Sequence, residues 1–108
     1  MEKIYNKLVR DKIPEIIEND GETPVVRVLN DNEYKKELEK KLKEEYEEVL
    51  LAKDKKERLE ELADMLEVIR TLALLEDEDI QSVINIMDKK REKRGGFTKK
   101  LFLEKTIK

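Results

Sequence analysis

The segment 62–75 constrains the fold of this chain most, because its apolar residues recur at the period of about 3.6 residues that is typical of an α-helix. Within it only Asp64, Glu67 and Arg70 are charged. Glu61 and Asp64 lie in or beside the apolar face of that helix. Such a face is normally covered by another helix, and carboxylates there are costly unless they are paired, protonated or bound to a metal. The segment therefore predicts a packed helix that carries a divalent cation.

Composition favours long amphipathic helices over a sandwich or a barrel. Of the 108 residues, 47% are charged, 38% are hydrophobic and 5% are aromatic. We expect a mainly α fold made of one domain over residues 1–108. The net charge of −3 provides no basic surplus for nucleic acid, and no apolar stretch is long enough to cross a membrane. With no signal-like start, the expected location is the cytoplasm.

Missing residue types narrow the chemistry. The chain has no cysteine and no histidine, which excludes disulfides, Ser-His and Cys-His dyads, and a zinc site with histidine or cysteine ligands. Carboxylates, hydroxyls, lysine and arginine remain available for chemistry.

Turn and capping residues divide the chain into four expected helices. A short helix begins near Pro14 and ends at Gly21. Longer helices are expected over about 32–52, from Asp54 to about Leu75, and from the acidic link 76–79 to Gly95. The β-branched segment 25–29 and the partly alternating tail 97–107 are expected to pair as a small two-stranded β element.

The second and third expected helices should form an antiparallel hairpin, because only a short link around Lys53 separates them. Glu45 and Glu48 precede this link by about two turns, and Glu61 and Asp64 follow it at a similar distance. The two acidic pairs should therefore meet across the hairpin. A site made only of oxygen ligands suits Mg²⁺, and also Mn²⁺.

The acidic residues 44–48 and the basic residues 89–94 both have simpler interpretations than a functional site. The acidic residues 44–48 are also compatible with a solvated helix face, since acidic residues are frequent in this chain. The basic run 89–94 complements a helix carboxyl end and promotes solubility, or Lys90, Lys93 and Arg94 bind an anionic substrate. Basic residues near the amino terminus could either assist such binding or pair with surface acids; they are Lys7, Arg10 and Lys12. Tyr5 and Phe97 are expected in the core rather than against a nucleobase.

Several motifs in order resemble the all-α nucleoside triphosphate pyrophosphohydrolase superfamily, in its MazG-like and phosphoribosyl-ATP pyrophosphohydrolase-like group. The acidic signature consists of Lys41-x-x-Glu44-Glu45-x-x-Glu48 and Glu61-Leu62-Ala63-Asp64-Met65-Leu66. Flanking motifs that resemble the second branch are Tyr5-Asn6-Lys7-Leu8-Val9-Arg10-Asp11-Lys12-Ile13-Pro14 and Lys93-Arg94-Gly95-Gly96-Phe97. The resemblance covers most of the chain.

The resemblance implies a four-helix fold that forms a dimer or larger homo-oligomer. It implies Mg²⁺-dependent hydrolysis of a nucleoside triphosphate or related nucleotide between the α and β phosphates, which yields a nucleoside monophosphate and pyrophosphate. By position, the metal ligands are Glu45, Glu48, Glu61 and Asp64. Glu44 and Glu45 are the candidate catalytic carboxylates. The candidate phosphate contacts are Lys90, Lys93 and Arg94. The chain departs from the family in its nucleoside-recognition segment, where Asn85 is the one asparagine available.

Two rival functions remain open from the sequence. The first is a non-catalytic helical module that dimerises or docks on a partner. The second is nucleic-acid binding through the basic carboxyl end, which the balanced charge and the scarcity of aromatics disfavour.

Overall fold

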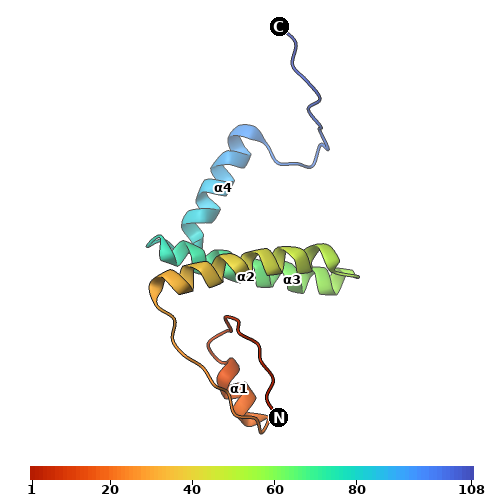
Figure 1. The fold of residues 1–108 in the computed structure, drawn as a ribbon. Helices are drawn as coiled ribbons and strands as arrows, with labels where there is room; N and C mark the ends of the chain where they lie inside the picture. The colour runs from red at the N-terminus through yellow and green to blue at the C-terminus, as the bar shows by residue number, and fades with distance from the viewer.

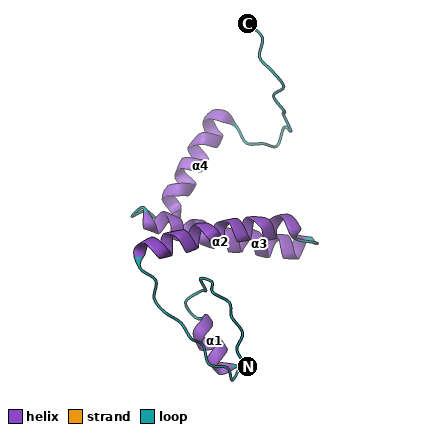
Figure 2. Cartoon of the chain, in the orientation of Figure 1, coloured by secondary structure: helices purple, strands orange, loops and turns teal.

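The computed structural model describes all 108 residues and contains four α-helices and no strand (Figures 1 and 2). Helix α1 spans Ile13–Asn19 and α2 spans Asp31–Leu51. Helix α3 spans Lys55–Leu75 and α4 spans Ile80–Arg94. The expected four helices and the all-α fold class are thus confirmed, with helix ends within about two residues of those expected from capping residues.

Capping side chains fix where the three long helices begin. Asn30 and Glu33 form a complete capping box, in which the Asn30 side chain accepts from the Glu33 N–H at 2.9 Å. Asp54 accepts from the Glu57 N–H at 2.8 Å, and Asp79 accepts from the Ser82 N–H at 3.1 Å. Each cap satisfies a backbone donor that the first turn of a helix leaves free.

Helices α2 and α3 lie side by side as an antiparallel hairpin, and they form the main packed unit of the chain (Figure 1). Leu38 and Val49 of α2 and Val68 and Ala73 of α3 are buried. The only other buried residue is Glu45. The hairpin therefore places a carboxylate among the few residues that are withdrawn from solvent.

The remaining elements extend away from the hairpin. Helix α4 contacts α3 but not α2, and the tail after it continues outward, whereas α1 contacts none of the other helices (Figure 1). The radius of gyration is 18.7 Å, against about 13 Å for a compact chain of this length. Only five residues of 108 are buried, so this arrangement leaves most apolar side chains partly or largely exposed.

The predicted two-stranded β element is wrong. Residues 22–30 and the tail from 101 onward have no regular secondary structure (Figure 2). The two segments lie on opposite sides of the hairpin, so their β-branched residues have no strand to pair with (Figure 1). Tyr5 and Phe97 are not in the core either, since 57% and 98% of their surfaces are exposed. No helix combines the length and the apolar composition that crossing a bilayer requires.

Candidate metal centre

Three carboxylates meet across the hairpin. Glu45 comes from the second half of α2, and Glu61 and Asp64 come from the first half of α3, one turn apart. One carboxylate oxygen of each lies within 4.8 Å of the others. The short link after α2 sets the register of the hairpin and brings these three residues to the same height.

The cluster concentrates negative charge in a partly buried place. Only 8% of the Glu45 surface is exposed, and Glu61 and Asp64 are half-buried. Burial, and then the charge of Asp64, raises the pKa of both Glu45 and Glu61 above the usual value of a glutamate. For Glu61 the next contribution is the charge of Glu48. Each negative charge at this place therefore makes the next one less favourable.

Two cations from different parts of the chain pair with carboxylates of the cluster. The Lys41 ammonium lies 3.7 Å from a Glu44 oxygen and 3.8 Å from a Glu45 oxygen, one turn back on α2. The Arg10 Nη2 donates to Asp64 Oδ1 at 2.8 Å from the segment before α1. Glu61 has no cation within ion-pair distance, so the cluster keeps an excess of negative charge.

The other predicted site residues divide into near and distant ones. Glu48 is exposed and stands outside the group of three, although its charge acts on Glu61. Glu44 is half-buried and faces Lys41. The sequence analysis gave Lys41 no role. Its spacing of three and four residues from Glu44 and Glu45 nevertheless predicts ion pairs along a helix.

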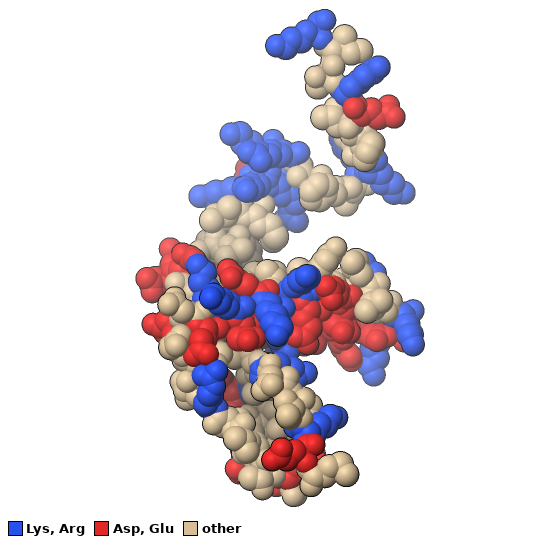
Figure 3. All heavy atoms as spheres, viewed as in Figure 1, with Lys and Arg blue, Asp and Glu red and all other residues tan.

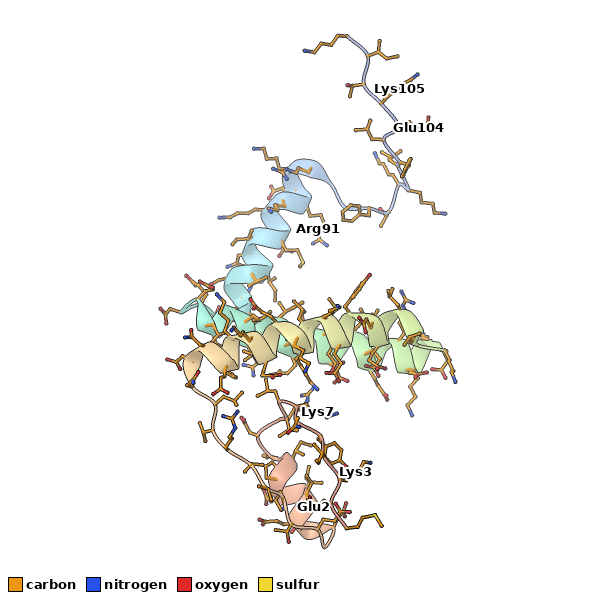
Figure 4. All side chains as sticks on the ribbon, viewed as in Figure 1. Glu2, Lys3, Lys7, Arg91, Glu104 and Lys105 are labelled. Carbon is orange, nitrogen blue, oxygen red and sulfur yellow. The ribbon has the colours of Figure 1, made fainter.

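The basic residues of α4 do not reach the acidic cluster within one chain. Basic side chains dominate the end of helix α4, whereas the hairpin shows many acidic side chains mixed with basic ones (Figure 3). Arg91, Glu104 and Lys105 all lie well beyond the hairpin (Figure 4). Lys90, Lys93 and Arg94 form no ion pair. Arg94 lines a hollow of about 270 Å³ between the end of α4 and the tail, where Gly95 adopts a φ of +83°.

The donor set fits a hard divalent cation. Carboxylate oxygens are the ligands that Mg²⁺ and Mn²⁺ prefer, and the three here are close enough to share one ion or a pair of ions. Burial first, and then repulsion from the charge of Asp64, raises the pKa of Glu45 and Glu61. A cation between them would remove this repulsion.

Comparison with known proteins agrees with the motifs. A family model described as phosphoribosyl-ATP pyrophosphohydrolase matches residues 7–91 and so includes the acidic cluster, Arg10 and most of α4. An uncharacterised protein of Mycolicibacterium smegmatis is 48% identical over 54 residues, which are 50% of this chain and 55% of the relative. The chain thus matches about half the length of that relative, and no solved structure matches it. The match over residues 7–91 shows that the chain belongs to the phosphoribosyl-ATP pyrophosphohydrolase family, within the all-α nucleoside triphosphate pyrophosphohydrolase superfamily.

Proposed function

We propose that this protein is a Mg²⁺-dependent nucleotide pyrophosphohydrolase. It cleaves a nucleoside triphosphate or related nucleotide between the α and β phosphates and releases a nucleoside monophosphate and pyrophosphate. The observation that carries this proposal is the convergence of Glu45, Glu61 and Asp64 within 4.8 Å, in a chain of a pyrophosphohydrolase family.

The proposed ligands of the ion are Glu45, Glu48, Glu61 and Asp64. Glu48 lies at the exposed edge of the cluster and acts on Glu61, so it would join when the ion and the substrate are both present. Mg²⁺ would neutralise charge on the phosphate oxygens and on the carboxylates, and would lower the pKa of a bound water. Mn²⁺ would bind through the same four ligands.

We propose that a glutamate of this chain accepts the proton of the attacking water. Glu44 and Glu45 are neighbours on α2, and Lys41 holds both. Burial raises the pKa of Glu45, and a raised pKa makes a carboxylate a stronger base near neutral pH. Attack at the α phosphorus breaks its bond to the bridging oxygen, and pyrophosphate leaves with that oxygen. In this scheme one of the two glutamates takes the proton of the attacking water.

Self-association belongs to the same proposal. Leu59, Leu62 and Leu66 follow one another along one side of α3, and between 45% and 57% of their surfaces are exposed. Burial of such a stripe against a second copy would supply the core that one chain lacks. We therefore propose a dimer or larger homo-oligomer. Lys90, Lys93 and Arg94, which lie away from the cluster within one chain, are retained as proposed phosphate contacts that such an assembly would bring closer.

A nucleotide panel tests the proposed activity. Purified protein is incubated with the common ribo- and deoxyribonucleoside triphosphates and phosphoribosyl-ATP, with and without Mg²⁺, and pyrophosphate and monophosphate are measured. We expect equal amounts of both products, only with the metal, from at least one nucleotide. If no nucleotide is turned over at any metal concentration, the non-catalytic helical module becomes the better account of the exposed apolar stripe.

A further inference from the structure

The segment before α1 touches the hairpin through a single polar contact. The bond from Arg10 to Asp64 is the only hydrogen bond or ion pair between residues 1–26 and helices α2 and α3. It joins residues 54 positions apart in the sequence. The contact is made at one of the three clustered carboxylates and not elsewhere on this acidic hairpin.

The backbone of Arg10 is fixed at this place. Its carbonyl accepts from the Ile13 N–H at 3.0 Å, which closes the turn that leads into α1. Earlier in the segment, Asn6 adopts a φ of +46°, a left-handed conformation that asparagine tolerates better than most residues. The Arg10 guanidinium is therefore carried by a turn and not by a free end.

Arg10 also has unused capacity for binding. A guanidinium offers five N–H donors in a plane, and the structure gives one hydrogen bond from this group, at Nη2. Its side chain remains 60% exposed, compared with 23% for Lys41, the other cation of the cluster. An anion that approaches the carboxylates from solvent therefore meets Arg10 more readily than the less exposed Lys41.

We propose that Arg10 binds a phosphate oxygen of the metal-bound nucleotide, with Asp64 holding the guanidinium beside the metal. The planar donors suit phosphate oxygens, and the bond to Asp64 orients them before the ligand arrives. This proposal rests on the proposed function and assigns part of its phosphate recognition. It predicts that loss of Arg10 weakens phosphate binding but not metal binding.

The chain offers a matched control in Arg27. Its Nη2 lies 2.8 Å from a Glu33 oxygen, the same distance as in the Arg10 pair, and both arginines are mostly exposed. Glu33 caps the start of α2 and is not one of the clustered carboxylates. Arg27→Ala therefore removes the same charge and an exposed arginine–carboxylate ion pair away from the site, although this pair has two hydrogen bonds where the Arg10 pair has one.

The test measures binding by two probes. Mn²⁺ alone is titrated by its electron paramagnetic resonance signal, and inorganic pyrophosphate in Mn²⁺ buffer is titrated by calorimetry. We expect Arg10→Ala to weaken pyrophosphate binding by about tenfold or more, the usual effect of losing a hydrogen bond to a charged group, with Mn²⁺ affinity equal to or above that of the wild type. Arg10→Lys should lose less, and Arg27→Ala should change neither affinity.

Two results would overturn the inference while leaving the proposed metal-dependent function standing. One is an Arg10→Ala protein that binds pyrophosphate as the Arg27→Ala protein does. The other is a parallel loss of Mn²⁺ and pyrophosphate affinity, which would make Arg10 a support for Asp64 alone. If the wild type binds neither probe, the proposed function itself fails, and the assignment of Arg10 fails with it.

Discussion

The hairpin of α2 and α3 differs in charge and in packing from the arm formed by α4 and the tail. In the hairpin, 14 acidic and 10 basic residues are mixed over positions 31–75, and the two helices bury apolar residues against each other. In residues 89–108 there are nine basic and two acidic residues, and the apolar side chains of the tail are almost fully exposed. The hairpin is thus a unit with its own packing, and the arm is not.

The contrast indicates which parts of the proposed site a single chain can assemble. The carboxylates meet because two adjacent helices in register position them. The basic residues of α4 lie at the far end of a helix that touches only α3, so nothing in one chain brings them to the carboxylates (Figure 3). Arg10 is the cation that reaches the cluster from solvent within the chain. Each of the following experiments changes one side of this comparison.

Removing a charge from the cluster should have the largest effect. Asp64→Asn or Glu45→Gln removes a proposed ligand, and loss of several kcal/mol of metal stabilisation corresponds to a rate lower by about 1,000-fold. Pyrophosphate release measures the rate, and circular dichroism checks that the helices persist. Glu47→Gln and Glu60→Gln, which alter exposed positions on the same two helices, should keep near-normal activity. Equal activity in all four variants would contradict the assignment of the centre.

Placing a charge on the exposed stripe of α3 should have the next largest effect. Leu62→Glu or Leu66→Glu would bury a carboxylate in the proposed contact between copies, and each leucine lost from an interface costs about 1.5–3 kcal/mol. The dimer dissociation constant should therefore rise by about tenfold or more. Light scattering over a concentration series measures it. Val25→Glu, in the coil before α2, should leave the assembly unchanged; a wild type that stays monomeric at high concentration would contradict the proposal.

The pH dependence of stability tests the electrostatics of the cluster without metal. Because the pKa of Glu45 and of Glu61 is raised in the folded chain, the folded state binds more protons than the unfolded state between the ordinary and the raised pKa. The free energy of unfolding should therefore fall as the pH rises through this window and level off above it.

Glu45→Gln should remove part of this fall, because the amide carries no charge at any pH. In metal-free buffer at pH 8 the variant should melt higher than the wild type, at about 4–8 °C for each kcal/mol gained, while at pH 4 the two should differ little. Added Mg²⁺ should reverse the order at pH 8, since only the wild type keeps all its ligands. A wild type that melts higher than the variant at pH 8 without metal would contradict this account.

The sequence predicted the helices and the hairpin better than it predicted contacts between distant segments. Caps, periodicity and the short link at residues 52–54 act locally, so they predicted the helices and the meeting of Glu45, Glu61 and Asp64, although Glu48, which was predicted with them, lies outside the group. The paired strands were wrong because pairing depends on where distant segments lie, and alternation within each segment says nothing of that. The contact of Arg10 with Asp64 spans 54 positions and comes from a turn, where no helical period indicates which side chain faces the hairpin.

Removing a helix cap should have the smallest effect on stability. It also compares the hairpin directly with α4. Asp54→Ala removes the cap of α3, within the packed unit, and should lower the free energy of unfolding by about 1 kcal/mol. Asp79→Ala removes an equivalent cap from α4, whose only helical neighbour is α3. If α4 unfolds independently of the hairpin, this loss should appear as faster amide exchange within α4 and leave the main thermal transition almost unchanged. Equal losses in that transition would mean that α4 unfolds together with the hairpin, and the arm would then stabilise the chain as much as the hairpin does.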